Sequence, residues 1–343
     1  MPSEQMEIST NGALGRIALN RPQAINALSL EMIEGIAGAL RRWRDDGAIR
    51  AVLFTGNGEK GFCAGGDVRA ARAHVVAGHP ELADAYFTAE YEMNGMIAGY
   101  PKPLIALSHG IVMGGGIGIA GHCRVRLTQP NARFAMPESA IGFFSDVGVN
   151  AILARAPVNR ALLFLMSGVT VGAADALALG LADVVVASDR AAAIVQELAG
   201  AAAASAPEAA IVRLCEAEAV DAGAAEFCAL ADLLPGDMPA SPADFIASVA
   251  AVPALGAIAA LLAARSPTAL SAIFHAQLAA RRQMDIAATL AMDLRLARVM
   301  ARSPDFSEGV RAVLVDKDQS PHWSPMRLDE VDVDAILGAV EDR

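Results

Sequence analysis

The segment HGIVMGGGIGIAGH (residues 109–122) decides how the middle of the chain folds. It follows the apolar strand pattern LIALSHG (104–110), and its three consecutive glycines open a helix. Glycine allows the backbone to turn tightly and to approach a ligand closely. Because the first N–H groups of a helix have no intrahelical partners, this turn can donate to an anion or to a developing oxyanion.

The same segment formally satisfies the dinucleotide-binding pattern GxGxxG at Gly116, Gly118 and Gly121. That fold needs a longer helix, followed by a second strand that ends in an acid. Here the next strand pattern, VRLT (125–128), begins soon after the glycines, and Gln129 follows it. Nucleotide binding is therefore the weaker alternative, and a turn that donates N–H groups is the stronger one.

A second glycine turn lies in GFCAGGDVRA (61–70), after the buried strand pattern AVLFTG (51–56). Gly65 and Gly66 precede Asp67, which is a suitable N-cap for the helix pattern that follows. A plain turn with a helix cap explains this stretch when it is taken alone. Taken with the first glycine turn, it predicts two N–H donors that point at a single carbonyl oxygen.

Strand patterns alternate with helix patterns around these turns, which is typical of an α/β fold with a largely parallel sheet. From Ala191 onward the sequence is Ala-rich and helical, with few strand signals. We therefore expect an α/β core over residues 1–195 and a helical C-terminal region over 196–343 that completes the fold and the active site. The other expected strands are 15–20, 132–136 and 182–187, and the expected helices are 30–44 with Ser29 as N-cap, 82–98, 149–156, 159–166, 173–179 and 266–301.

The composition limits the classes of partner. The chain has 343 residues, 54% of them hydrophobic, and a formal net charge of -11. This length suits one large domain or two modest ones. The negative charge argues against a nucleic-acid partner, because nothing would release counterions from a phosphate backbone. It does not exclude an anionic ligand, since backbone N–H groups bind anions locally.

The cysteines and the apolar runs indicate the cellular compartment. The four cysteines form no CxxC pair and no Cys/His cluster with the spacing of a zinc site. Reduced thiols and a cytoplasmic location are the expectation. The polar start MPSEQMEIST does not resemble a secretory signal, and Pro253 and Gly256 interrupt a long apolar run. We therefore expect neither a membrane span nor a metal site.

The segment FAMPESAIGFFSDVGVN (134–150) is mostly apolar and yet holds two carboxylates, Glu138 and Asp146. A buried carboxylate is costly unless it is paired or used. Apolar neighbours raise its pKa toward the range of a general acid or base. Asp146 could equally cap the helix pattern that follows it. No helix clearly starts at Glu138, so a cap does not explain that residue.

These stretches, in this order, resemble the crotonase (enoyl-CoA hydratase/isomerase) superfamily. The resemblance begins at NRPQAINALSLEM (20–32) and covers about residues 7–190 and 266–325. It is closest to the 3-hydroxyisobutyryl-CoA hydrolase branch, whose order of MPE, IG, an aromatic or Leu-Phe pair and DVG is similar to FAMPESAIGFFSDVG. SPTAL (266–270) and DFSEGVRAVLVDKDQSPHW (305–323) resemble its C-terminal signature. The resemblance implies the spiral ββα fold of the superfamily.

The resemblance also implies roles for individual residues. The N–H groups of Gly66 and Gly115 match the oxyanion hole that holds the thioester carbonyl of an acyl-CoA. Glu138 falls at the catalytic glutamate of the superfamily, and Asp146 at the acid characteristic of the hydrolase branch. Glu90, in FTAEYEMN, falls on a helix whose glutamate reaches the substrate; a surface acid is the alternative. The other substrate-binding residues implied are Ala64, Asp67 and Gly114.

Several positions depart from the related patterns. Hydratases carry a further glutamate three residues after the second oxyanion glycine, and this chain has Gly118 there, which argues against water addition to an enoyl-CoA. The hydrolase branch usually has Pro where this chain has Ser145, Gly where it has Val149, and commonly a basic residue where it has Gln23. These departures concern substrate choice and CoA phosphate contacts more than the reaction type.

The resemblance thus implies hydrolysis of a short-chain 3-hydroxyacyl-CoA, with 3-hydroxyisobutyryl-CoA of valine catabolism as the expected substrate. Glu138 would activate water as a general base or attack the carbonyl to give a mixed anhydride, and the sequence leaves both routes open. CoA is part of the substrate, and no other cofactor is expected. Enoyl-CoA hydration or isomerisation and acyl-CoA binding without catalysis are the alternatives. A homo-oligomer is also open, because the superfamily often assembles into trimers and hexamers.

Overall fold

The computed structural model describes residues 4–283 and 285–342. The chain forms two compact units, each assembled from three segments that alternate along the sequence. The boundary at residue 195 between an α/β core and a helical C-terminal region remains a prediction. The first unit comprises Met1–Gly66, Glu92–Phe134 and Val171–Ala225, and the second comprises Asp67–Tyr91, Ala135–Thr170 and Glu226–Arg343.

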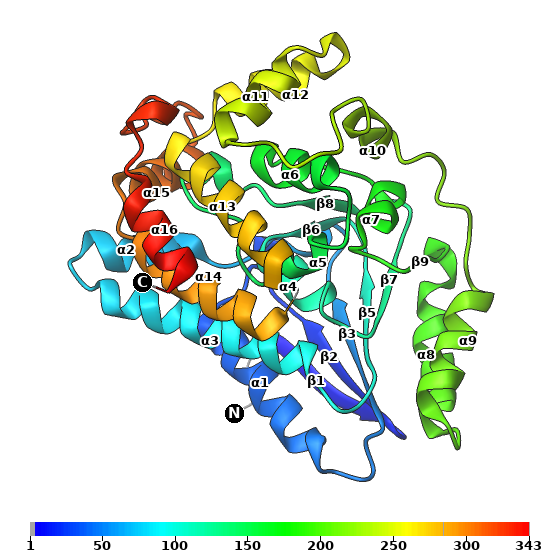
Figure 1. Ribbon diagram of the computed structural model, residues 1–343. Helices are drawn as coiled ribbons and strands as arrows, with labels where there is room; N and C mark the ends of the chain where they lie inside the picture. The colour runs from blue at the N-terminus through cyan, green and yellow to red at the C-terminus, as the bar shows by residue number, and fades with distance from the viewer. Residues whose placement is uncertain (1–3, 284, 343) are drawn as a thin grey trace. The chain divides into compact units, whose positions relative to one another are not determined.

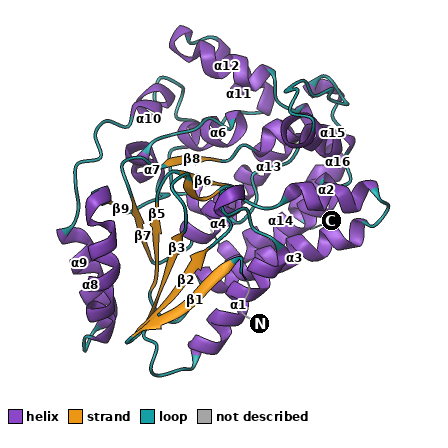
Figure 2. Ribbon diagram, turned by 180° about the vertical axis from the view of Figure 1, so that it is seen from behind, coloured by secondary structure: helices purple, strands orange, loops and turns teal. Residues whose placement is uncertain are grey.

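The first unit contains a six-stranded sheet (Figure 2). Strands β1 and β2 are antiparallel, and every later pair is parallel, which confirms the expected α/β class. Strand β1 was not expected, because only its first residue is buried and it has no apolar alternation. In sheet order the strands are β1 (Met6–Asn11), β2 (Leu14–Leu19), β3 (Ala51–Gly56), β5 (Leu104–Ser108), β7 (Val125–Thr128) and β9 (Val184–Val185).

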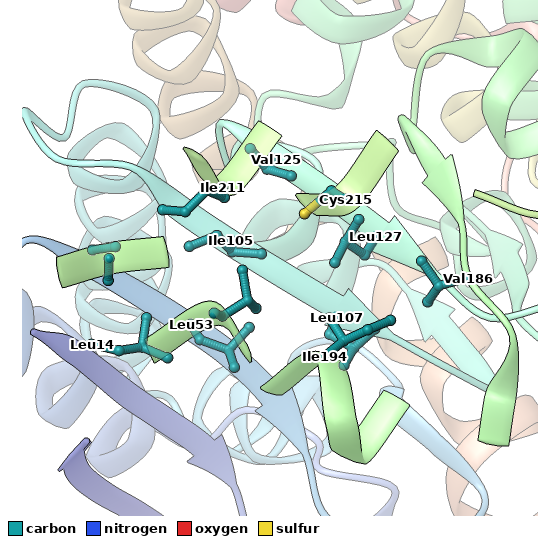
Figure 3. Close-up of a cluster of buried hydrophobic side chains, with 13 residues drawn as sticks. Leu14, Leu53, Ile105, Leu107, Val125, Leu127, Val186, Ile194, Ile211 and Cys215 are labelled. Carbon is teal, nitrogen blue, oxygen red and sulfur yellow. The ribbon is translucent and has the colours of Figure 1, made fainter. Parts of the chain in front are cut away.

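Helices α8 (Ala191–Ala203) and α9 (Pro207–Ala217) pack against this sheet (Figure 3). Alternate strand residues point to the same face of a sheet, so each strand contributes side chains two positions apart to the contact. Helices α8 and α9 contribute buried apolar residues at helical spacing to the same contact. The buried side chains of this core include Leu14, Leu53, Ile105, Leu107, Val125 and Leu127 from the sheet, and Ile194, Leu198, Ile211 and Cys215 from the helices.

Short elements of the first unit carry the two glycine turns. Strands β4 (Gly61–Cys63) and β6 (Ile111–Met113) pair in parallel within a three-stranded sheet that also contains β8 (Arg133–Ala135). Helix α4 (Gly115–Ala120) begins almost directly after β6, as the glycine run predicted. Each glycine turn therefore follows a strand, and the two strands are neighbours.

Two predicted helices of the first unit have the expected bounds, and one of them has the expected capping side chain. Helix α1 (Leu30–Arg44) has the expected bounds, and the side chain of Ser29 accepts a 3.3 Å hydrogen bond from the Met32 N–H. The expected helix 173–179 is α7 (Ala173–Leu179). A polar N-cap satisfies one of the orphan N–H groups at a helix start, which is why this signal is readable from sequence.

The second unit is helical. Helix α3 (Pro80–Ala98) contributes its residues through Tyr91 to this unit. Helix α13 packs against α14, α16, α5 and α6 (Figure 1). The remaining elements of the unit include α2 (Val68–Val76), η2 (Glu138–Ile141), α5 (Val149–Leu153), α6 (Val158–Ser167), α10 (Glu226–Ala231), α11 (Pro242–Ala250), α12 (Gly256–Ala263), α13 (Pro267–Gln283), α14 (Ile286–Met300), α15 (Pro304–Val310) and α16 (Val333–Glu341).

The expected helical stretch over 266–301 consists of two helices, α13 and α14. Asp285 is the N-cap of α14, and its Oδ1 accepts a 2.7 Å hydrogen bond from the Ala288 N–H. An Asp cap at this point starts a new helix rather than continuing the old one.

The C-terminal segments are tied to the segment that carries Glu138. A Cβ added at Gly309 of α15 would lie 2.4 Å from the carbonyl carbon of Ile141, so only glycine allows α15 to approach η2 this closely. Asp305 joins two other C-terminal pieces, since it accepts hydrogen bonds from the Ser266 hydroxyl at 2.5 Å and from the Ser324 N–H at 2.7 Å. The close approach at Gly309 packs α15 directly against η2.

Candidate active site

Four buried carboxyl side chains lie in the second unit. Glu90 lies on α3, Glu138 is the first residue of η2, Asp146 lies in the loop before α5, and Asp293 lies on α14. Each is at most 7% exposed. Burying four acids is costly, and the electrostatic effects described below couple them through Asp146. We call Glu90, Glu138, Asp146 and Asp293 the acid cluster.

Asp146 has a specific partner. The hydroxyl of Tyr91 donates a 2.6 Å hydrogen bond to its Oδ2. Burial raises the pKa of Asp146 to about 6, and the Tyr91 hydrogen bond opposes that rise by stabilising the ionised form. A carboxyl group with this pKa changes its protonation state close to neutral pH, as a general acid or base requires.

The pKa values of Glu90 and Glu138 depend on the charge of Asp146. Burial raises the pKa of each well above its ordinary value, and the charge of Asp146 raises it further. A hydrogen bond from Tyr86 lowers the pKa of Glu90 in part. Oε2 of Glu138 and Oε1 of Glu90 have no hydrogen-bond partner among the residues that the structure describes. These two oxygens therefore keep their capacity to bond a ligand or to move a proton.

Aromatic side chains pack together close to Tyr91 and to the loop that carries Asp146. Phe87 lies on α3 one turn before Tyr91, with ring centroids 6.0 Å apart, and it stacks on Phe143 at 5.3 Å. Phe143 also contacts Phe144 at 4.9 Å and Phe306 at 5.3 Å. The prediction that Asp146 has apolar neighbours is confirmed. Burial of the carboxyl groups away from water is the largest cause of their raised pKa values.

The alternatives left open for the three predicted acids are resolved by this geometry. Glu90 is not a surface acid, because it is only 2% exposed. Asp146 does not cap α5, whose N-cap is Gly148. The expectation that no helix starts at Glu138 is wrong, since the 3₁₀ helix η2 begins there. This helix has only four residues, which is too short to show helical periodicity in the sequence.

Two members of the site were missed by sequence reasoning. Tyr91 reads as one of several aromatic residues on the apolar face of a helix, and nothing local distinguishes it. Asp293 offered a weak signal, because it interrupts the apolar stripe formed by Leu290, Leu296 and Ala297 on α14. An acid at a core position of an amphipathic helix needs a partner, which only the folded chain reveals.

The two glycine turns meet in the first unit. A Cβ added at Gly65 would lie 3.5 Å from the backbone nitrogen of Gly115, and one at Gly116 would lie 2.5 Å from the carbonyl oxygen of Cys63. Gly65 has a φ of 106°, and Gly114, before α4, has a φ of 47°. The structure therefore brings together the two turns to which the sequence assigned the N–H donors of Gly66 and Gly115.

The remaining predicted residues lie beside these turns along the chain. The N–H of Ala64 donates to the carbonyl of Ile25 at 2.9 Å. Asp67 is the N-cap residue of α2, but its side chain does not accept the capping hydrogen bond, and its N–H donates to the Tyr86 hydroxyl at 3.2 Å. Gly118, at the position of the hydratase glutamate, is buried inside α4.

The departures from the hydrolase pattern differ in their surroundings. Ser145 and Val149 are fully buried beside Asp146, and the carbonyl of Ser145 accepts a 2.6 Å hydrogen bond from the Asn150 side chain. Gln23 lies in the exposed turn η1 (Pro22–Ala24). The first two changes therefore affect the shape of the loop that carries Asp146, and the third affects a surface turn.

Within residues 4–283 and 285–342, no group of three or more His, Cys, Asp or Glu side chains is arranged to hold a metal ion. Over the same ranges no single helix has both the length and the apolar character to cross a membrane. Among the described residues, the pair Pro242–Ala250 and Pro253–Ala263, bent by 105°, meets that test when the two helices are combined.

Known proteins resemble this chain over almost its whole length. The model of the enoyl-CoA hydratase/isomerase family matches residues 14–339. The 3-hydroxyisobutyryl-CoA hydrolase of Xenopus tropicalis mitochondria is 36% identical, over 95% of this chain and 86% of its own. The human mitochondrial 3-hydroxyisobutyryl-CoA hydrolase is 33% identical, over 96% of this chain and 86% of its own.

Solved structures share the fold. A carnitinyl-CoA dehydratase from Mycobacterium thermoresistibile is 35% identical with a TM-score of 0.87, over 98% of this chain and 96% of its own. An enoyl-CoA hydratase from Rhodobacter sphaeroides is 30% identical with a TM-score of 0.89, over 98% of this chain and 97% of its own. The expected crotonase fold is confirmed, and the chain belongs to the enoyl-CoA hydratase/isomerase family.

Proposed function

We propose that this chain hydrolyses the thioester of a short-chain 3-hydroxyacyl-CoA, with 3-hydroxyisobutyryl-CoA as the substrate and 3-hydroxyisobutyrate and CoA as the products. The observation that carries the proposal is the likeness to curated 3-hydroxyisobutyryl-CoA hydrolases at 33% to 36% identity over about 95% of the chain. The buried, proton-exchanging Asp146 supports it, because the resemblance assigns that acid to hydrolases.

The glycine turns have an electrostatic role in this proposal. The N–H groups of Gly66 and Gly115 would donate to the thioester carbonyl and stabilise the oxyanion that forms when a nucleophile adds to its carbon. Each such donor is worth roughly 3–4 kcal/mol where it has been measured in other enzymes. Gly115 is the first residue of α4, where backbone N–H groups have no partner within the helix.

Glu138 would provide the nucleophile in one of two ways. As a general base it would take a proton from water while the water oxygen bonds to the carbonyl carbon. As a nucleophile its own oxygen would form that bond and give a mixed anhydride, which water then hydrolyses. In both routes the carbon–sulfur bond breaks, and the departing CoA thiolate takes a proton from an acid of the cluster.

Asp146 and Glu90 would assist at other atoms. With its pKa near 6, Asp146 is mostly ionised at neutral pH and would orient the water as a hydrogen-bond acceptor, while Tyr91 holds its Oδ2. Glu90 has an unpartnered oxygen and would bond the hydroxyl of the acyl group. A buried carboxyl that bonds a substrate hydroxyl discriminates strongly against acyl groups without one, because the carboxyl is then left unpaired. Ala64, Asp67 and Gly114 are proposed to contact the substrate beside the turns.

A thiol-release assay tests the function directly. Purified protein is mixed with CoA thioesters of 3-hydroxyisobutyrate, other short 3-hydroxy acids and the matching acids without the hydroxyl, and free CoA is followed with a thiol reagent. Rapid release from 3-hydroxyisobutyryl-CoA, with slower release from the acids without a hydroxyl, supports the proposal. No release from any thioester would overturn it.

A second candidate is hydration or isomerisation of an enoyl-CoA, since two solved relatives are described as a carnitinyl-CoA dehydratase and an enoyl-CoA hydratase. Gly118 argues against it, because it lacks the acid that the resemblance implies for hydratases. Loss of enoyl absorbance from crotonyl-CoA without release of thiol would favour this candidate. Tight acyl-CoA binding with no turnover of either kind would favour a binding protein without catalysis.

Cofactor use, cellular setting and assembly are part of the proposal. We propose that the reaction needs no metal or cofactor apart from the CoA of the substrate, so dialysis against a chelator leaves the rate unchanged. Valine degradation in the cytoplasm is the proposed setting, consistent with four buried free cysteines. Light scattering of the purified protein distinguishes a monomer from the trimers and hexamers common in the superfamily.

A further inference from the structure

The turn that carries Asp146 has an unfavourable backbone conformation. Val147 has a φ of 54° and Gly148 a φ of 74°, so two consecutive residues are left-handed. Glycine adopts this conformation without penalty, but a β-branched residue such as Val rarely does. Val147 is also buried, so the turn cannot relieve its backbone strain by moving its side chain into solvent. A strained turn of this kind persists only when surrounding contacts fix it.

Asp293 supplies such a contact. Its Oδ2 accepts a 2.8 Å hydrogen bond from the N–H of Gly148, across 145 residues of sequence. The side chain is completely buried, and Oδ1 has no hydrogen-bond partner among the described residues. A carboxyl that is buried for a single backbone hydrogen bond is expensive compared with an apolar residue on the same helix face. Its position is therefore better explained by the turn than by packing.

The charges that face Asp293 come from the acid cluster and from α3. Asp146 raises the pKa of Asp293 beyond the rise that burial causes, while the bond from Gly148 lowers it. Asp293 in turn raises the pKa of Tyr91, as do Asp146 and Glu90. The N–H of Gly148 and the charge of Asp146 therefore act on the Asp293 carboxyl in opposite directions.

We propose that Asp293 is a positioning residue of the hydrolase: its carboxyl holds the N–H of Gly148, fixes the left-handed turn, and so keeps Asp146 directed at the hydroxyl of Tyr91. Asp293 touches no substrate in this proposal and acts through Asp146 alone. The inference rests on the proposed thioester hydrolysis for its kinetic readout. Its structural readout, the order of the turn, is independent of any activity.

Two substitutions of Asp293 distinguish the effect of its hydrogen bond to Gly148 from the effect of its packing. Asp293→Asn keeps an oxygen that accepts from Gly148 and should retain kcat for thiol release within about threefold. Asp293→Leu has a similar shape but no acceptor, and should lower kcat at least about tenfold with little change in KM. The acidic limb of the kcat profile should move to higher pH in the Leu variant only, because the Tyr91 bond that lowers the pKa of Asp146 is weakened. Met292→Leu, a volume-conserving change at the neighbouring buried residue of α14, is the control and should change neither.

Hydrogen exchange gives the readout that does not depend on turnover. Mass spectrometry of the peptide spanning residues 145–150 should show wild-type protection in Asp293→Asn and faster exchange in Asp293→Leu, while peptides of α13 remain protected. If the Leu variant does not fold, Asp293→Ala, which also lacks the acceptor, replaces it.

The outcomes distinguish the two proposals. A folded Leu variant with wild-type kcat, pH profile and exchange overturns the positioning role, as does an Asn variant that is damaged as severely as the Leu variant. If the wild-type protein releases no thiol from any thioester, the proposed function fails. The exchange comparison then still decides whether Asp293 fixes the turn.

Discussion

The hydroxyl of Tyr91 donates a 2.6 Å hydrogen bond to Oδ2 of Asp146, although 55 residues separate the two in sequence. Burial of Asp146 favours its neutral form, and this hydrogen bond favours its ionised form. The balance places the pKa of Asp146 at about 6. Asp146 is thus mostly ionised at neutral pH and gains a proton readily when the medium is slightly acidic, and the pKa values of Glu90 and Glu138 depend on its state.

Glu138→Gln should reduce thiol release from 3-hydroxyisobutyryl-CoA between about hundredfold and ten-thousandfold, the usual range for losing a general base. The amide can neither accept a proton from water nor form the anhydride. Binding of the acyl-CoA, measured by calorimetry, should persist. The matched control is Glu92→Gln, the same change at an exposed position of α3, which should retain full activity. Full activity in Glu138→Gln would exclude the assigned role.

Tyr91→Phe should make the enzyme more sensitive to acid. The hydrogen bond from Tyr91 lowers the pKa of Asp146, so its removal raises that pKa and moves the acidic limb of kcat above its wild-type position near pH 6. The lost bond to a charged group should reduce kcat about tenfold at pH 6 and less at pH 8. Rates measured from pH 5 to pH 9 check this. Tyr100→Phe removes another hydroxyl, which bonds to the Leu40 carbonyl, and should leave the profile unchanged.

Asp146→Asn should stabilise the protein while it abolishes hydrolysis. The folded-state pKa of about 6 lies above the unfolded value of 3.8, so the folded state binds more protons between these two values. The contribution of Asp146 to stability therefore falls as pH rises through this window and is least favourable above it. Removing the charge should give a gain that grows from pH 4 to pH 7 and reaches at most roughly 3 kcal/mol.

Denaturant unfolding at pH 4 and pH 7 measures this gain. The exposed change Asp45→Asn, at the C-terminal end of α1, serves as the control and should give little gain at either pH. A gain in Asp146→Asn that is largest at pH 4 would contradict the assignment of a raised pKa.

Gly116→Ala should lower kcat by displacing the glycine turns of the first unit. The added Cβ would lie 2.5 Å from the carbonyl oxygen of Cys63, which forces the two glycine turns apart. Misplaced oxyanion donors should lower kcat about ten- to a hundredfold, with KM less affected. Gly200→Ala, in α8 with no atom within 4 Å of its added Cβ, should leave kcat unchanged and stabilise the helix by about 0.5–1 kcal/mol. Equal kcat values for the two variants would argue against the oxyanion role of the turns.

The sequence determined the local structure of the fold. Gly65 and the glycines of α4 predicted tight turns, because few other residues adopt those backbone angles or allow so close an approach. Ser29 predicted the start of α1, because a polar side chain at the N-cap accepts a hydrogen bond from a backbone N–H that has no partner within the helix. Apolar periodicity predicted β3 and β7, whose side chains are buried, and missed β1, whose side chains are mostly exposed. The presence of Glu138 and Asp146 in apolar surroundings was equally readable.

Only the tertiary structure decided how these acids interact. Tyr91 and Asp293 contribute to the site through hydrogen bonds that span 55 and 145 residues, and no local pattern encodes such distances. Periodicity shows which face of a helix is buried, but it does not show which buried side chain on that face meets which partner. The pKa of Asp146 depends on the sum of its burial, its Tyr91 hydrogen bond and a hydrogen bond from its own backbone. That sum exists only when α3, α14 and the loop before α5 pack together.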